Sequence, residues 1–154
     1  MDSTDYHLVR LLQADGRATQ LELSKRVGLS QPATAERIRK LEESGVITGY
    51  AAQVDAARLG RDVTAFIGVS IEHPRHFDGF VKKVLALPEV LECHRVAGED
   101  SYLLKVRTTT TRALDALLVK ALRTIPGVTR TFTTIVLSSA KETTAIDVDP
   151  PRGA

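Results

Sequence analysis

Two capped helical segments joined by only three residues constrain the fold of this chain most strongly. Thr19 and Glu22 have the spacing of a capping box, in which a hydroxyl and a carboxylate satisfy free amides at a helix start, and Gly28 ends this short segment. Ser30 is a candidate N-cap for the next segment, whose apolar positions keep helical spacing until Gly45. Because so short a connection forces a sharp bend, residues 19–43 are predicted to form a helix-turn-helix.

The rest of the N-terminal region predicts one helix before this pair and a small hairpin after it. Apolar residues at helical spacing mark a first helix over 6–12. A strand-like pattern over 46–54 predicts a hairpin or wing. We therefore assign residues 1–54 to a winged helix-turn-helix domain and residues 55–62 to a linker.

Residues 63–142 show the element order of a ferredoxin-like sandwich, in an α+β fold. Period-two alternation or helical spacing predicts, in order, a strand over 64–71, a helix over 77–85, strands over 90–96 and 102–107, a helix over 114–122 and a strand over 131–137. Such a βαββαβ unit leaves one face of an antiparallel sheet without helices, and a second copy of the chain is its natural cover. Dimers are therefore expected, and residues 143–154 are expected to form a C-terminal tail.

The composition excludes several classes of protein. With 43% hydrophobic and 26% charged residues, a chain of 154 residues forms ordinary cores, and no apolar run approaches the roughly 20 residues that cross a bilayer. The N-terminal residues lack the pattern of a signal peptide, so a cytoplasmic location is expected. The single cysteine, Cys93, has no partner for a disulfide and no cluster of zinc ligands around it in the sequence.

Basic side chains gather in the predicted helix-turn-helix. Residues 1–62 carry nine basic and nine acidic side chains, but residues 17–40 hold six Lys or Arg against two Glu. This local excess favours contact with nucleic acid. The balanced total keeps an alternative open, in which the chain is an oligomeric metabolite-binding module with little affinity for DNA.

One face of the second helix of this pair is predicted to enter the major groove of DNA. Steps of 100° place Ala33, Glu36, Arg37 and Lys40 opposite the apolar stripe of Ala35, Ile38 and Leu41. Ala33 permits close approach, Arg37 has the donors to bind guanine, and Glu36 can accept from cytosine. The other interpretation is a solvated charged face. The complete set of predicted DNA-binding residues, including those expected to hold phosphates, is Lys25, Ser30, Gln31, Ala33, Thr34, Glu36, Arg37, Arg39 and Lys40.

Seven segments that run in order through almost the whole chain carry a family resemblance. They are DYHLV at 5–9, ADGR at 14–17, LELSKRVGLS at 21–30, RIRKLE at 37–42, GVITGY at 45–50, LECHRVAG at 91–98 and GVTRTFT at 127–133. Together they resemble the Lrp/AsnC family of feast/famine, leucine-responsive transcriptional regulators.

The resemblance implies a winged helix-turn-helix joined to a ligand-sensing RAM domain that forms dimers, often assembled into octamers. Members bind operator DNA and respond to amino acids or related metabolites. The family's two basic positions in the recognition helix fall on Arg37 and Lys40. Glu36 departs, because many relatives are basic there, and this departure bears on base preference and background binding.

A polar loop is the candidate effector site. Where relatives commonly have Gly, an acid, an aromatic, Asp and Tyr, this chain has Gly98, Glu99, Asp100, Ser101 and Tyr102, so two positions depart. The loop offers carboxylates for an ammonium group and amides for a carboxylate, which suits an amino acid; the other interpretation is a turn that merely joins strands. Thr131 and Thr133 are weaker candidates for lining the site.

No motif predicts catalysis, so the chain is not expected to be an enzyme or to carry a cofactor. His73 and His76 lack a third metal ligand at a usual spacing. Cys93 and His94 are neighbours in a predicted strand, where their side chains point to opposite faces and cannot act as a nucleophile and base. RNA binding through the βαββαβ unit is not expected, because the sequence lacks the aromatic segment of an RNA recognition motif.

Overall fold

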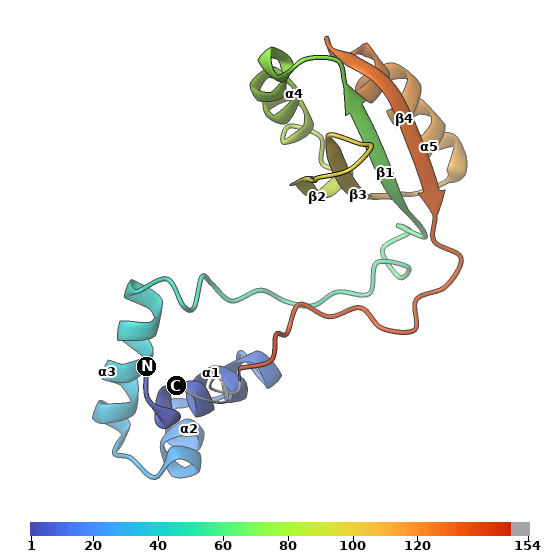
Figure 1. Ribbon diagram of the computed structural model, residues 1–154. Helices are drawn as coiled ribbons and strands as arrows, with labels where there is room; N and C mark the ends of the chain where they lie inside the picture. The colour runs from blue at the N-terminus through green and yellow to red at the C-terminus, as the bar shows by residue number, and fades with distance from the viewer. Residues whose placement is uncertain (149–154) are drawn as a thin grey trace. The chain divides into compact units, whose positions relative to one another are not determined.

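The computed structural model describes residues 1–148, which fall into two compact units (Figure 1). The first unit comprises Met1–Gln53 together with the chain from Lys141, and the second comprises Val54–Ala140. The end of the predicted tail, residues 149–154, lies outside the described residues. No helix within residues 1–148 has the length and apolar character needed to cross a membrane.

Three helices build the first unit, and their ends follow the capping chemistry of the sequence. They are α1 (Ser3–Ala14), α2 (Gln20–Val27) and α3 (Gln31–Glu43). The predicted capping box of Thr19 and Glu22 is present, and Gly28 ends α2 with a left-handed φ of 70°. Ser30 caps α3 by accepting a hydrogen bond from the amide of Ala33. The predicted helix-turn-helix is therefore confirmed.

The core of the first unit joins its three helices to the C-terminal segment. Leu8 of α1, Leu23 of α2 and Leu41 of α3 are each less than 5% exposed, and burying one such side chain is worth about 1.5–3 kcal/mol. Val148 belongs to the same cluster. The side-chain amide of Gln13 pairs with the backbone of Ile146, donating to its carbonyl at 3.0 Å and accepting from its amide at 2.8 Å. The last described residues thus complete the first unit.

The hairpin predicted over residues 46–54 is wrong. Within the described chain these residues form no strand. The amides of Val46 and Ile47 both donate to the carbonyl of Leu41, at 3.0 Å, which finishes the end of α3. A strand needs a partner with which to exchange backbone hydrogen bonds, and residues 46–54 form no such ladder.

The second unit has the predicted βαββαβ order. Its elements are β1 (Val63–Ile71), α4 (Phe77–Val84), β2 (Val90–Arg95), β3 (Tyr102–Thr108), α5 (Thr111–Ala116) and β4 (Val128–Ile135). A 3-10 turn precedes α4, and α5 continues through one π turn and one 3-10 turn to Thr124. The strands lie in the order β2-β3-β1-β4, and every neighbouring pair is antiparallel.

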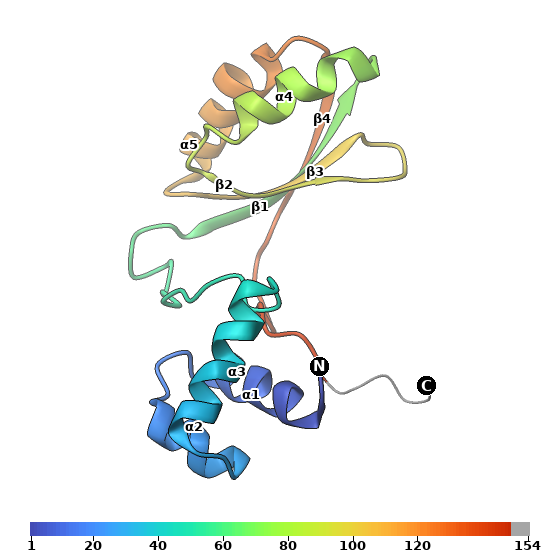
Figure 2. The ribbon, with the colours of Figure 1, turned by 90° about the vertical axis from the view of Figure 1, so that its left-hand side faces the viewer.

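Both helices of this unit cover the same face of its sheet (Figure 2). Alternate residues of β1, namely Ala65, Ile67 and Val69, are fully buried beneath them. The opposite, outer face of the sheet carries Phe66, Leu103 and Phe132, of which Phe132 is 63% exposed. Since cross-strand partners share a face, the register shows which side chains point outward: Gly68, for example, pairs with both Leu103 and Phe132.

Candidate DNA-binding helix and effector loop

The turn between α2 and α3 sets up a face that is open to solvent. Only Gly28, Leu29 and Ser30 separate the two helices, and the amide of Leu29 donates to the carbonyl of Ser24, at 3.0 Å. Thr34 and Leu41 point into the unit, whereas Ala33, Glu36, Arg39 and Lys40 are exposed. This arrangement has the size and shape that a major groove accepts.

Thr34 cannot hold a phosphate in this fold, so that prediction is wrong. The residue is fully buried, and its hydroxyl donates to the carbonyl of Ser30 at 3.0 Å. Thr34 lies four residues before Ile38 and seven before Leu41, so all three share the buried stripe of α3. By contrast, the predicted phosphate-binding residues Lys25, Ser30 and Gln31 are exposed.

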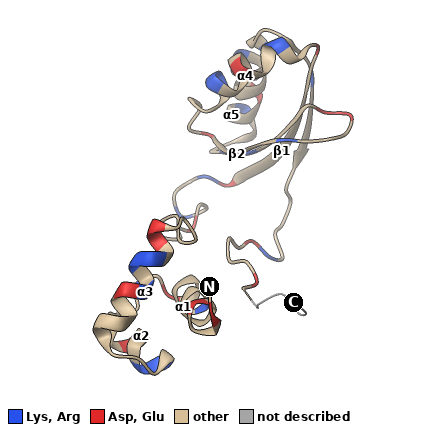
Figure 3. Ribbon diagram, turned by 60° about the vertical axis from the view of Figure 1, so that its left-hand side comes forward, with Lys and Arg blue, Asp and Glu red and all other residues tan. Residues whose placement is uncertain are grey.

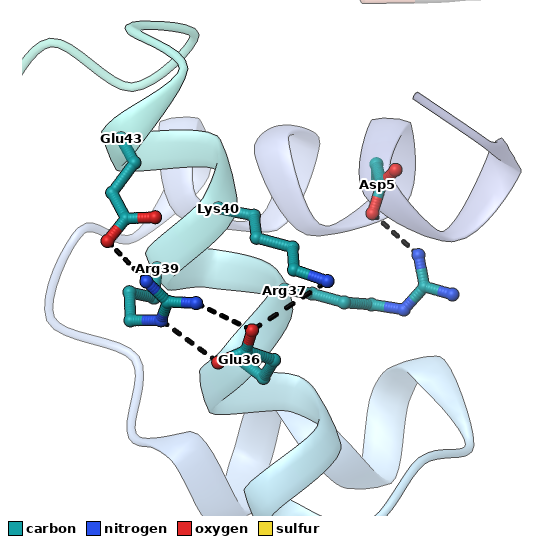
Figure 4. Close-up of polar contacts among 6 residues, drawn as sticks. All are labelled: Asp5, Glu36, Arg37, Arg39, Lys40 and Glu43. Carbon is teal, nitrogen blue, oxygen red and sulfur yellow. Dashed lines mark hydrogen bonds and ion pairs between the residues drawn. The ribbon is translucent and has the colours of Figure 1, made fainter.

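Arg37, which was predicted to lie on the outer face of α3, lies at the edge of this open face. One terminal nitrogen, Nη1, donates to Asp2 Oδ2 at 2.8 Å and to Asp5 Oδ1 at 2.7 Å. Figure 4 shows the Arg37 side chain reaching toward Asp5 on α1, away from Glu36 and Arg39. The hydrogen bonds to Asp5 and Asp2 raise the pKa of Arg37, and its side chain is 33% exposed. Position 37 turns toward α1 because it is three residues after the buried Thr34.

The two remaining cations of α3 pair with carboxylates on the same helix. Arg39 donates to Glu36 from Nε at 2.9 Å and from Nη2 at 2.7 Å, and it also pairs with Glu43. Lys40 Nζ lies 3.7 Å from Glu36 Oε1. The hydrogen bond from Arg39 lowers the pKa of Glu36. Figure 3 shows basic and acidic residues along the same stretch of α3. The open face is thus almost neutral, and its ion pairs lie in solvent, where phosphates can replace the carboxylates.

One exposed cation beside this face was missed by the sequence prediction. Arg26 follows Lys25 in the last turn of α2, and within the described chain neither side chain has a hydrogen bond or ion pair. The signal was present, because both belong to the basic stretch over 17–40. These two side chains are free to reach phosphates next to α3.

Asp100 of the predicted effector loop folds over the outer face of the sheet. Its Oδ1 accepts from Ser70 Oγ at 3.0 Å and from Arg130 Nη2 at 3.4 Å. Its carboxylate lies directly above Gly68, where any Cβ would be within 2.1 Å of Oδ2. Ser101 Oγ accepts from the amide of Ile71 at 3.1 Å. The loop is therefore attached to β1 and β4 through the two residues that depart from the family pattern.

Tyr102 is a core residue, which contradicts the prediction that it contacts an effector. It is 6% exposed and lies against Phe77 and Phe80, with ring centroids 5.4 and 4.9 Å away. Tyr102 pairs with Val69 across the sheet, so its ring points to the helix-covered face, while Asp100 lies on the outer face. Asp100 lies in the loop before β3, where the alternation of a strand does not apply, so the loop pattern alone did not separate the roles of these two residues.

Thr131 and Thr133 also lie on the helix-covered side, apart from Asp100. They pair with Val69 and Ile67, which are buried beneath the helices. Thr131 Oγ1 accepts from Arg123 Nε at 3.0 Å beside a shallow hollow of about 330 Å³. Within one chain, the predicted effector residues therefore do not surround a single cavity. Gly98 and Glu99 are exposed at the tip of the loop, where Glu99 lies 3.6 Å from Arg130.

Other side chains with reactive groups do not assemble into a further site. Residues 1–148 contain no cluster of three His, Cys, Asp or Glu side chains able to hold a metal ion. Cys93 is half-buried, and burial raises the pKa of its thiol. A raised pKa makes a thiol less reactive at neutral pH.

Comparison with protein families matches both units of the chain. Residues 1–48 match a family described as winged helix-turn-helix DNA-binding, and residues 64–146 match the Lrp/AsnC ligand binding domain. Among curated proteins, the HTH-type transcriptional regulator LrpA of Mycobacterium tuberculosis is 42% identical over 139 residues, covering 90% of this chain and 91% of LrpA. The leucine-responsive regulatory protein of Escherichia coli is 38% identical over 144 residues, covering 92% and 88%.

Solved structures agree with this match. A transcriptional regulator of Neisseria meningitidis, crystallised in complex with L-Met, superposes with a TM-score of 0.93 at 33% identity, covering 97% of both chains. AsnC of Escherichia coli superposes with a TM-score of 0.88 at 30% identity, covering 94% of this chain and 97% of AsnC.

Proposed function

Since the chain belongs to the Lrp/AsnC family of helix-turn-helix transcriptional regulators, we propose that it controls transcription by binding operator DNA in a sequence-specific manner, under the influence of an amino acid or related metabolite. The observation that carries the DNA-binding role is the face of α3, whose exposed side chains stand clear of the buried stripe. A regulator of this kind works beside the chromosome, so a cytoplasmic location and a non-enzymatic role belong to the same proposal.

On this proposal, phosphate contacts surround a small reading surface. Lys25, Arg26, Ser30 and Gln31 hold the backbone at the α2–α3 turn, and Arg39 and Lys40 hold it farther along α3. Ala33 and Glu36 face the bases, where Glu36 accepts from cytosine N4. Binding to DNA transfers Arg39 and Lys40 from Glu36 to phosphates, which frees the carboxylate for that contact.

A salt titration tests this role directly. The preferred duplex is first selected from a random-sequence pool, and its affinity is then measured by fluorescence anisotropy between about 50 and 200 mM salt. Lys25→Ala and Lys40→Ala should each lower the slope of log affinity against log salt by about one. Lys82→Ala, an exposed lysine of α4, should leave the slope unchanged. A wild-type protein that selects no sequence and shows no salt dependence would refute the proposal.

The pairing of cations on α3 favours one second candidate. Because Arg37, Arg39 and Lys40 each face a carboxylate, a module that binds a metabolite and has little DNA affinity would show the same geometry. The two functions differ at low salt, where electrostatic attraction is strongest. A regulator binds even an unselected duplex there, whereas the module does not.

For the second unit we propose an amino-acid effector site that two copies of the chain complete together. The outer face of the sheet carries Phe66, Leu103 and Phe132, and a second copy covering this face would also lie against Asp100. Support comes from the Neisseria relative, whose structure contains L-Met. In such a site, Gly98, Glu99 and Ser101 of the loop meet the ligand, whereas Thr131 and Thr133, which point to the helix-covered side, lie outside it. Further assembly, to an octamer, follows from the family resemblance.

Two measurements test this part. Light scattering should show at least a dimer, and Phe132→Lys, which places a charge on the outer face, should lower the mass of the assembly. A thermal-shift screen against the amino acids should raise the melting temperature for a subset with related side chains, because a ligand that prefers the native state stabilises it. No shift with any amino acid would contradict the proposed effector class.

A further inference from the structure

We propose that Asp2 and Asp5, two acidic residues at the start of α1, are positioning residues for DNA recognition: acting through Arg37, they hold α3 in the orientation that reads DNA. The inference rests on the proposed DNA-binding function and adds a role that charge alone would not suggest. Carboxylates normally repel a polyanion, whereas these two are expected to strengthen specific binding.

The four carboxylate oxygens are divided between two tasks. Asp2 Oδ1 accepts from the amide of Asp5 at 3.0 Å, and Asp5 Oδ2 accepts from the amide of Asp2 at 2.9 Å, which together form the capping box of α1. The other oxygen of each residue accepts from Arg37 Nη1. The guanidinium is therefore bound to the capped first turn of α1, and it cannot shift without disturbing both carboxylates.

Arg37 lies at the right place on α3 for its bonds to Asp2 and Asp5, here called the anchor, to fix the orientation of the helix. It lies four residues after Ala33 and three before Lys40, so it borders the open face on the side of α1. The remaining contacts of α3 with the core, through Thr34, Ile38 and Leu41, are packing contacts that allow small rotations of a helix about its axis. A directional charged bond removes that freedom, and a rotation of a few tens of degrees would misplace every side chain that reads a base.

The opposite view is that the carboxylates withhold Arg37 from DNA. The geometry favours positioning, since Asp5 is the more buried partner, with its side chain 17% exposed, and Arg37 itself is only 33% exposed. An Arg held in reserve for phosphates would be expected on the open face, where Arg39 and Lys40 stand. The two views predict opposite signs for the same substitution, so one experiment separates them.

The test replaces both carboxylates in the full-length protein by Asp2→Asn and Asp5→Asn. Asparagine is as good an N-cap as aspartate, so the capping oxygens remain while the charges that hold Arg37 are removed. Asp62→Asn with Asp115→Asn is the matched control, because these exposed carboxylates of the second unit change the net charge equally. Affinities are measured for the duplex selected by the wild-type protein and for poly(dI-dC).

We expect the Asp2/Asp5 variant to bind the selected duplex about tenfold more weakly than the control variant. Its affinity for poly(dI-dC) should stay equal or rise, since only orientation-dependent contacts are lost. Arg37→Met should produce the same loss, and adding it to the Asp2/Asp5 variant should cause no further loss. Stronger binding of both duplexes by the Asp2/Asp5 variant would overturn the proposal, and so would unchanged binding of both.

Amide hydrogen exchange across α3 gives a readout that needs no DNA. Loss of the anchor should speed exchange in the middle of α3 at temperatures where the protein stays folded, while the control variant exchanges like the wild type. Equal exchange in all three proteins would overturn the positioning role. If the wild-type protein bound neither duplex, the proposed function would fail, and this exchange measurement alone would decide the role of the anchor.

Discussion

Replacing Gly68 by alanine should push Asp100 off the outer face of the sheet. A Cβ at position 68 would lie 2.1 Å from Asp100 Oδ2 and 2.7 Å from its Cγ, both far too close. The backbone of Gly68 does not have the left-handed conformation that alanine would resist, so the strand itself accepts the new residue. The side chain of Asp100 must therefore move, and its bonds to Ser70 and Arg130 are lost.

The expected cost follows from these two contacts. The 3.0 Å hydrogen bond from Ser70 is charge-assisted, but Asp100 is 25% exposed and water replaces part of it, so we assign the loss about 1–2 kcal/mol. Alanine in place of glycine within a strand stabilises the folded state by about 0.5–1 kcal/mol. The net destabilisation by Gly68→Ala should be about 0.5–1 kcal/mol in the wild-type protein. In an Asp100→Ala background the clash is absent, and the same substitution should stabilise by about 0.5–1 kcal/mol.

A double-mutant cycle measures this change of sign. The wild type, both single variants and the double variant are unfolded in urea, and circular dichroism follows the loss of structure. An equal effect of Gly68→Ala in both backgrounds would refute the reasoning, because the clash with Asp100 would then contribute nothing. If the loop also binds the effector, Gly68→Ala should reduce the thermal shift given by any amino acid that stabilises the wild type.

Three further predictions concern the first unit. Val148→Ala should destabilise the first unit by about 1 kcal/mol, which faster amide exchange in α1 would show. Ile146→Ala is the control and should have no such effect, because Ile146 is 72% exposed. Equal effects of the two substitutions would contradict the packing of this segment against α1. Glu36→Gln should raise affinity for poly(dI-dC) severalfold, because it frees Lys40 and leaves Arg39 paired with Glu43 alone. Asp62→Asn is the control, and an unchanged affinity would count against the pairing seen on α3. The hydrogen bond from the amide of Thr19 lowers the pKa of Glu22 below its usual 4.5, so its contribution to stability is present above that pH and is lost as the pH falls through the lowered value. The free energy of unfolding, measured in urea between pH 6 and 3, should therefore fall less steeply for Glu22→Gln than for the wild type. Parallel curves for the two proteins would exclude this contribution.

Much of the fold could be predicted because its signals are local. A capping box joins residues three apart, and Gly28 ends α2 through its own backbone conformation. Alternation along β1, together with Pro88 and Pro126, which follow the two helical patterns in the sequence, indicated the βαββαβ order in the same way. The family resemblance adds the pairing of these two units in one chain, which neither periodicity nor composition specifies.

The roles of individual site residues were decided by tertiary structure. Thr34 and Arg37 were expected on the open face of α3, but only the packing of α1 against α3 shows that one is buried and the other bound to Asp5, 32 residues away in sequence. Tyr102 and Asp100 looked alike as loop residues until the register of β1 and β3 placed Tyr102 on the helix-covered face, and the contact with Gly68 placed Asp100 on the outer face.

The amino-acid sequence by itself therefore determined the order of the helices and strands in the second unit and the caps of α2 and α3, because those features depend on hydrogen bonds and side-chain periods that span a few residues. Only the tertiary structure decided which charges are free to meet DNA and which segment completes the first core. Gln13 and Ile146, for instance, are 133 residues apart, and nothing in either neighbourhood marks them as partners. Contacts of that kind depend on how whole faces of helices and sheets pack, and a short sequence pattern does not specify which surface will pack against it.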